Sequence, residues 1–131
     1  MNIRPYFTYL IALWIAFFEG YWKPGSRASQ NNNPGNLRSW GDRPTLNGFA
    51  FFETPADGFL ALIKQVNKNI DRGLTLQEFF AGKPGVYPGY APAADDNDPE
   101  NYASFISKKT GIPLADVPIK QFIEDINQRL T

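Results

Sequence analysis

The longest apolar stretch of the chain lies near its start. No charged residue occurs between positions 5 and 18, and apolar side chains recur there at helical spacing. The pattern predicts a helix over residues 5–18. Because apolar residues occupy nearly every face of this helix, we expect it to be buried inside the fold. The residues at helical spacing are Phe7, Leu10, Ile11, Trp14, Ile15 and Phe18.

This apolar segment is too short to cross a membrane. Its fourteen residues, if helical, reach about 21 Å, whereas the hydrocarbon core of a bilayer is ~30 Å thick. An export signal or anchor stays open as a second interpretation of residues 1–18, although only Arg4 precedes the apolar part and no small-x-small cleavage site follows. We therefore expect a core helix and no stable membrane span.

Two irregular segments and one hairpin are predicted further along the chain. Residues 20–35 and residues 86–97 lack periodicity and are rich in turn formers. Loops of this length inside a compact domain commonly bind a ligand or carry catalytic residues. Residues 36–40 and 49–53 are short aromatic-bearing runs separated by turn formers that include Asn47-Gly48, which predicts a β-hairpin.

Capping residues mark the starts of the remaining helices, and glycines mark most of their ends. With the first helix they give about five helices and one small hairpin, so we predict a mostly α, α+β fold in a single domain spanning residues 1–131. The later helices are expected from Thr54-Pro55 to Gly73, from the capping box Thr75-x-x-Glu78 to Gly82, from Asp98-Pro99 to Gly111, and from Pro118 to Leu130.

Composition narrows the chemistry that this chain can perform. Thirteen Lys and Arg balance thirteen Asp and Glu, so no large basic field is available for a nucleic-acid partner. The chain has no histidine and no cysteine, which excludes His-dependent triads, thiolate catalysis and the common zinc sites. No cofactor or metal is implied. Acid–base chemistry at neutral pH must therefore come from a carboxylic acid, a tyrosine or a lysine.

Glu19 is the first charge after the fourteen uncharged residues, where the apolar helix meets an irregular loop. Desolvation by apolar neighbours would raise the pKa of its carboxyl group and keep it protonated near neutral pH, as a general acid requires. The alternative is a solvent-exposed glutamate at a helix end, where the helix dipole modestly disfavours a negative charge. Position alone leaves both interpretations open.

The loop after Glu19 concentrates amide groups that both donate and accept hydrogen bonds, which suits hydroxyl- and acetamide-bearing ligands such as sugars. Asparagine and Pro-Gly also form turns without any ligand, so a purely structural role stays open. The run is Asn31-Asn32-Asn33-Pro34-Gly35-Asn36.

Aromatic and acidic residues in the loops and hairpin have two interpretations each. The aromatic rings would form platforms under sugar rings or pack into the core. Each acid would either face Glu19 as a second carboxylate or be an exposed surface or helix-capping residue. The aromatic residues are Tyr21, Trp22, Trp40, Tyr87 and Tyr90, and the acids are Asp42, Glu53, Asp95 and Asp96.

Four segments, taken together, resemble one protein family: lysozyme-like domains of bacteriophages and bacteria that degrade peptidoglycan. The resemblance covers nearly the whole chain, and its most specific part is Asn-Asn-Pro-Gly-Asn. The segments are Phe18-Glu19-Gly20, Asn31-Asn32-Asn33-Pro34-Gly35-Asn36-Leu37-Arg38, Gly48-Phe49-Ala50-Phe51-Phe52-Glu53-Thr54-Pro55-Ala56-Asp57-Gly58, and Tyr90-Ala91-Pro92 with Asp96-Asn97-Asp98 and Tyr102.

The resemblance implies a fold and a set of site residues. Lysozyme-like domains place the catalytic glutamate at the end of a core helix, facing a cleft closed by a small hairpin, and the match puts Glu19 there. A tyrosine orients the acid in some lytic transglycosylases, which nominates Tyr102 or Tyr90. Glu53 and Asp42 compete for the role of second carboxylate. The residues expected to contact or shape the sugar site are Trp22, Asn33, Asn36, Tyr90 and Asn97.

The leading functional hypothesis is therefore a muramidase or lytic transglycosylase. Members of the family cleave the β-1,4 bond between N-acetylmuramic acid and N-acetylglucosamine. The expected partner is the peptidoglycan glycan strand, and the protein is expected to be a monomer. It would act in the periplasm or cell wall, after export or as part of a virion. The alternatives are a non-catalytic carbohydrate-binding or virion structural module on the same fold, and a membrane-anchored partner-binding protein.

Overall fold

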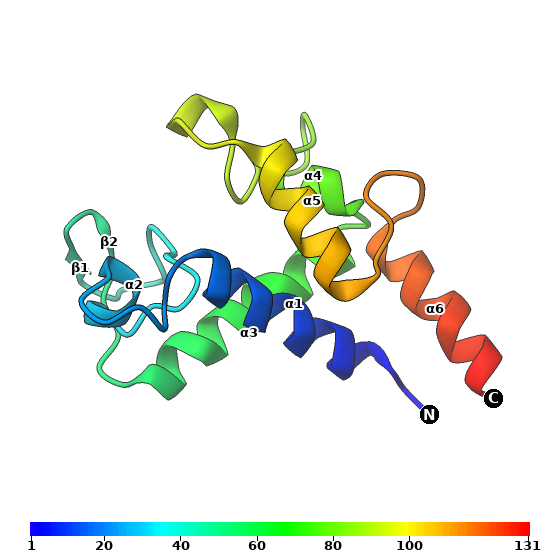
Figure 1. Ribbon diagram of the computed structural model, residues 1–131, viewed down its shortest axis with the longest axis horizontal. Coiled ribbons are helices and arrows are strands. Elements are labelled where there is room, and N and C mark those ends of the chain that lie inside the picture. The colour runs from blue at the N-terminus through cyan, green and yellow to red at the C-terminus, as the bar shows by residue number, and fades with distance from the viewer. The chain divides into compact units, whose positions relative to one another are not determined.

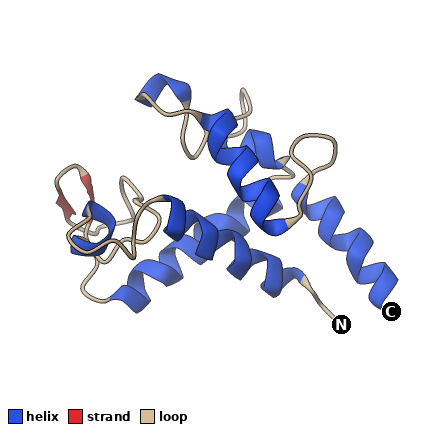
Figure 2. Ribbon diagram, viewed as in Figure 1, coloured by secondary structure: helices blue, strands red, loops and turns tan.

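A computed structural model describes all 131 residues. It is mostly helical with one small antiparallel hairpin, which confirms the predicted fold class (Figures 1 and 2). The elements run in the order α1 (Arg4–Phe18), α2 (Arg27–Gln30), β1 (Thr45–Leu46), β2 (Phe49–Ala50), α3 (Pro55–Asp71), α4 (Leu76–Ala81), the 3-10 helix η1 (Ala93–Asp95), α5 (Pro99–Thr110) and α6 (Ile119–Leu130).

The chain forms two compact units. The hairpin unit is Tyr9–Val66, and the helical unit combines Met1–Thr8 with Asn67–Thr131. The boundaries fall inside α1 and α3, so each of these helices contributes to both units. The single-domain organisation expected from the sequence stays a prediction.

The hairpin differs from its prediction in the first strand. β1 pairs with β2 through Thr45–Ala50 and Leu46–Phe49, so the strand predicted over residues 36–40 is wrong, whereas the second predicted strand begins at the expected residue. Asn47 and Gly48, with φ of 57° and 82°, form the two-residue turn. Such a turn joins the residues that directly flank it, which selects Thr45–Leu46 as the partner of Phe49–Ala50.

The segment mistaken for a strand is held in another way. Ala50 N–H donates to the carbonyl of Leu37, and the side-chain amide of Asn33 donates to the carbonyls of both Leu37 and Ala50, each at 2.9 Å. Leu37 N–H donates in turn to Asn33 Oδ1 at 3.0 Å. The buried amide thus supplies bonds that a partner strand would otherwise provide, so the loop lies against β2 without forming a ladder.

Helix α1 is buried along one side only. Ile11 and Ile15 have no exposed surface, whereas Tyr9, Leu13 and Phe17 are about half exposed. The expectation that this helix is buried inside the fold therefore holds for one side of it and is wrong for the other. No helix of the structure combines the length and the apolar character that crossing a bilayer requires.

The helices of the helical unit begin and end where local sequence signals placed them. Thr75 Oγ1 accepts from Glu78 N–H and Glu78 Oε1 accepts from Thr75 N–H, which completes the predicted capping box of α4. Asp98 caps α5, and Gly111 ends it in the left-handed region. Helices α4 and α5 pack together. The fully buried side chains of this unit include Ile70, Leu74, Leu76, Phe79, Phe80, Ile106, Ile112 and Ile119.

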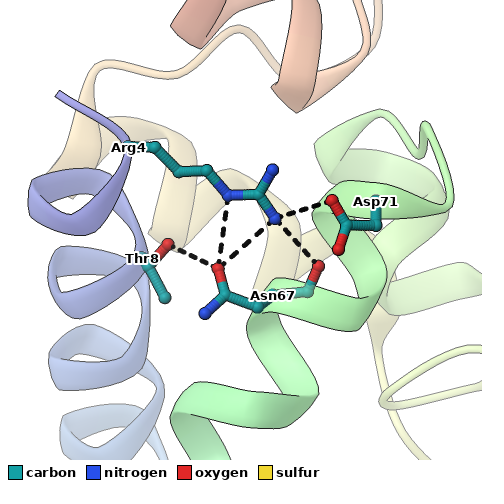
Figure 3. Close-up of polar contacts among 4 residues, drawn as sticks. All are labelled: Arg4, Thr8, Asn67 and Asp71. Carbon is teal, nitrogen blue, oxygen red and sulfur yellow. Dashed lines mark hydrogen bonds and ion pairs between the residues drawn. The ribbon is translucent and has the colours of Figure 1, made fainter. Parts of the chain in front are cut away.

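A polar cluster joins the start of α1 to the end of α3 within the helical unit (Figure 3). The Arg4 guanidinium donates to Asp71 Oδ1 at 2.8 Å and to the side-chain and backbone oxygens of Asn67 at 3.3–3.4 Å. Thr8 Oγ1 donates to Asn67 Oδ1 at 3.0 Å. The Arg4 side chain, which carries the charge before the apolar segment, is therefore held against α3.

Candidate functional site

Glu19 is the residue that caps the C-terminal end of α1. Its N–H continues the helical pattern by donating to Ile15 at 2.9 Å, and Gly20 follows with φ +77°. Gly20 N–H donates to Phe17 and Tyr21 N–H donates to Ala16, the two bonds of a Schellman ending. Only glycine adopts this φ without strain, so Gly20 ends the helix and leaves the half-buried Glu19 at the point where the loop begins.

Asn36 lies against Glu19. Its Nδ2 donates a 2.9 Å hydrogen bond to Glu19 Oε1, across 17 positions of sequence. A carboxylic acid accepts such a bond at its carbonyl oxygen, so a protonated Glu19 carries its proton on Oε2. Asn36 has φ 48°, a conformation that asparagine tolerates, and its Oδ1 is buried without a hydrogen-bond partner.

The other three asparagines of the run bind backbone. Asn33 is fully buried, and both ends of its amide are used by Leu37 and Ala50. Asn31 Nδ2 donates to the Leu46 carbonyl at 2.9 Å, and Asn32 Nδ2 donates to the Phe52 carbonyl at 2.9 Å. These asparagines hold the loop against the hairpin. In the run, Asn36 is the residue whose side chain binds Glu19.

Gly58 permits the close approach of α3 to this loop. A Cβ atom at position 58 would lie 1.8 Å from the Asn32 carbonyl oxygen and 2.9 Å from Pro34 Cδ. The helix start and the asparagine loop are in contact through bare backbone. Sequence reasoning missed this role, although a glycine near the start of an amphipathic helix is a signal of close backbone approach.

Aromatic side chains gather around the loop that follows Glu19. Tyr21 packs edge-on against both Trp22 and Phe59, with ring centroids 5.2 and 5.3 Å apart, and Trp22 lies 6.2 Å from Phe59. Tyr21 is half-buried, whereas Trp22 is 54% exposed. The cluster presents the indole to solvent three residues after Glu19.

A further aromatic contact in the hairpin unit involves two arginines that the sequence did not single out. The Arg27 guanidinium carbon lies 3.8 Å from the ring centroid of Phe49, and that of Arg38 lies 4.9 Å from it. Neither contact is local in sequence, so no spacing signal could have found the pair.

The acids considered as partners of Glu19 lie on the surface. Glu53, the leading candidate, is exposed and forms no hydrogen bond or ion pair. Asp42, Asp95 and Asp96 are exposed as well. No group of three or more acidic side chains is arranged to hold a metal ion.

Three predicted site residues belong to the helical unit. Tyr102 is 3% exposed and stacks on Phe80 with centroids 4.3 Å apart and an interplanar angle of 22°. Tyr90 lies edge-on to Tyr102 at 6.3 Å. Asn97 is exposed and donates to the Pro92 carbonyl at 3.3 Å. The two tyrosines have packing contacts here, and their proposed roles stay predictions.

Tyr87 also has contacts within the helical unit. Arg72 lies 4.7 Å from its ring centroid, and burial raises the pKa of the Tyr87 phenol against the lowering effects of the Asn69 hydrogen bond and the Arg72 charge. A group whose pKa is higher in the folded state contributes stability that is fully present below its unfolded pKa. That contribution is lost as the pH rises through the folded value.

We expect the free energy of unfolding to fall above pH ~10, the ordinary tyrosine pKa, and to fall less in Tyr87→Phe. The variant lacks the hydroxyl that must ionise, so the stability gap between the two proteins should narrow at alkaline pH. Urea unfolding at a series of pH values from neutral to alkaline measures the gap. A gap that stays constant would show that Tyr87 does not carry the effect.

Comparison with known proteins gives one relative. The chain is 30% identical over 115 residues to Protein P5 of Pseudoalteromonas phage PM2, and the alignment covers 78% of this chain. It covers 66% of Protein P5, just under two thirds of that protein's length. No family model and no solved structure matches the chain. The chain is thus a distant homologue of a bacteriophage protein, Protein P5 of phage PM2.

Proposed function

We propose that this chain is a peptidoglycan-cleaving glycosidase with a lysozyme-like architecture, and that Glu19 is its general acid. The observation that carries the proposal is the 2.9 Å bond from Asn36 Nδ2 to Glu19 Oε1 at the end of α1. A hydrogen bond to one oxygen holds the carboxyl group in a defined orientation, and general acid catalysis needs an oriented proton donor.

The chemistry follows from one carboxylic acid. Glu19 donates its proton to the glycosidic oxygen as the bond from that oxygen to the anomeric carbon breaks. The anomeric carbon then takes either a water molecule or a hydroxyl group of the same sugar, and the proton released returns to Glu19. Water gives a reducing end, and the sugar's own hydroxyl gives an anhydro end.

We favour the anhydro product. Retaining and inverting glycosidases commonly use a second carboxylate at a defined separation from the first. Glu53 is exposed and unpaired in the structure, so it lacks the contacts that would hold it in such a role. Without a second carboxylate, the acetamide of the substrate can assist the departure of the leaving group.

Digestion of purified cell-wall sacculi tests the proposal. We expect the protein to release soluble muropeptides, and mass spectrometry of their ends to show anhydro sugars. Water-added ends would keep the glycosidase and replace the transglycosylase chemistry. Sacculi that release no fragments under any buffer condition would overturn the catalytic proposal. The site of action that we propose is the bacterial wall or periplasm, reached by export or with a virion.

A non-catalytic wall-binding or virion module is the second candidate. It is favoured by the surface position of the acids that could assist Glu19 and by the homology to a phage protein. Binding to sacculi that is equal for the unchanged protein and Glu19→Gln, with no fragment released by either, would select this candidate.

Trp22 offers a separate test of the sugar site. If its exposed indole supports a sugar ring, Trp22→Ala should raise KM about tenfold and leave kcat within about twofold, because stacking holds substrate and transition state alike. Leu60→Ala is the matched control, since Leu60 is 56% exposed on α3. Equal KM values for the Trp22 variant and the control would remove Trp22 from the site.

A further inference from the structure

Arg27 and Arg38 approach the same aromatic ring. Their guanidinium carbons lie 3.8 and 4.9 Å from the Phe49 centroid, and both side chains are exposed whereas Phe49 is half-buried. The ring holds the planar part of each guanidinium by a cation–π contact and leaves its N–H groups directed elsewhere. Two positive charges are therefore gathered at one edge of the hairpin.

These two charges have no acidic counterpart in the fold. Like charges held around one ring repel each other, and a bound anion relieves that repulsion. Neither guanidinium takes part in an ion pair. The ion pairs of the structure include those that join Arg4 to Asp71, Arg43 to Asp57, and Lys83 to Glu78.

The pair is built into the segment that holds Asn36. Arg38 follows Asn36 by two residues, so their Cα atoms are at most ~7 Å apart. Leu37, between them, is fixed through its N–H by Asn33 and through its carbonyl by Ala50. Arg27 is the first residue of α2 and directly follows the N-cap residue Ser26. The loop that carries Asn36 therefore also carries Arg38, and Arg27 meets Arg38 at the ring of Phe49.

We propose that Arg27 and Arg38 bind a carboxylate of the peptide carried by the wall strand. This inference rests on the proposed function. Peptidoglycan bears, on each N-acetylmuramic acid, a short peptide with free carboxylates, so an anion accompanies the sugar next to the bond that Glu19 would protonate. A guanidinium matches a carboxylate with two parallel hydrogen bonds, and arginines already oriented by a ring lose less freedom on binding. The site would select peptide-bearing strands over bare glycan.

The experiment measures binding of three soluble glycan probes to the Glu19→Gln protein, which leaves the probes uncut. The first probe carries its peptides, the second has had them removed by an amidase, and the third keeps peptides whose carboxylates have been chemically amidated. Each is titrated against the same protein with Arg27→Gln and Arg38→Gln added. A charge-matched control carries Lys64→Gln and Lys108→Gln instead, at exposed positions on α3 and α5.

We expect the peptide-bearing probe to bind about tenfold more tightly than the other two probes. The arginine substitutions should abolish this preference and leave the binding of the other two probes unchanged. The lysine control should keep it. Arg27→Lys with Arg38→Lys retains both charges without the planar fork, so it should keep part of the preference and exclude misfolding as the cause.

Equal binding of the three probes would overturn the arginine site. So would a loss in the arginine variant that is the same for all probes, or an equal loss of preference in the lysine control. These outcomes leave the glycosidase proposal intact. Failure of that proposal has a different signature, because then the unchanged protein releases nothing from sacculi, whichever probes it binds.

Discussion

Glu19→Gln is expected to lower the rate of muropeptide release from purified sacculi at least a hundredfold. General acid catalysis contributes about 10²–10⁴-fold to a rate, and glutamine has no proton of suitable acidity to donate. The substitution preserves shape and can preserve the contact with Asn36, because the glutamine carbonyl oxygen accepts the bond now made to Oε1. A loss of rate would therefore report the proton rather than the geometry.

Two further glutamate-to-glutamine substitutions are compared with Glu19→Gln. Glu100→Gln removes one exposed carboxylate in the first turn of α5 and should leave the rate unchanged. Glu53→Gln should change it by less than about threefold if one carboxylate suffices, whereas a loss comparable to that of Glu19→Gln would indicate a second catalytic carboxylate. Equal release by Glu19→Gln and the unchanged protein, at equal thermal stability, would remove Glu19 from the chemistry.

Asn36→Ala tests how much the orientation of the Glu19 carboxyl group contributes to the rate. The substitution deletes the donor to Oε1 and the buried acceptor together, so it leaves no new unsatisfied group on residue 36. Its effect on the rate should lie between those of Glu53→Gln and Glu19→Gln, since the proton remains and only its placement is lost. Measured beside them, it tests whether the contact that carries the functional proposal matters to the reaction.

Local signals explain why so much of the fold is predictable from the sequence. The capping box at Thr75 and Glu78 and the Asp98 and Gly111 ends of α5 depend on residues within one helical turn of each other. The same holds for Glu19, whose place at the end of α1 follows from the apolar run before it and from Gly20 after it. Signals of this kind are complete in the sequence.

The missed features depend on contacts between distant segments. The strand predicted over residues 36–40 had suitable side chains, but the Asn33 amide took the bonds of Leu37 and Ala50, and the turn at Asn47-Gly48 chose the residues beside it. Likewise, α1 was expected inside the fold, but its outer side is exposed, because the sequence shows how apolar a face is and not whether anything covers it. The arginines on Phe49 have no periodic pattern at all.

Gly58→Ala is the substitution with the largest expected effect on stability. Helix propensity alone predicts a gain, because glycine inside a helix costs about 1 kcal/mol relative to alanine. The geometry reverses the sign. The added Cβ would lie 1.8 Å from the Asn32 carbonyl oxygen, a backbone atom that cannot rotate away, and 2.9 Å from Pro34 Cδ. We expect a loss of at least ~3 kcal/mol in the free energy of unfolding, in the range of severe overpacking.

Relief of this clash would have consequences for the candidate site. Asn32 and Pro34 belong to the run that ends at Asn36, so the loop cannot move away from α3 without moving the donor to Glu19. Any folded Gly58→Ala protein should then also lose wall-cleaving rate. Gly25→Ala is the control, because a Cβ at position 25 meets no atom within 4 Å and costs only the strain of its φ of +78°. Thermal unfolding of both variants measures whether Gly58→Ala stabilises or destabilises the protein. A raised unfolding midpoint in Gly58→Ala would mean that helix propensity outweighs the clash, and that α3 and the asparagine loop are not held in close contact.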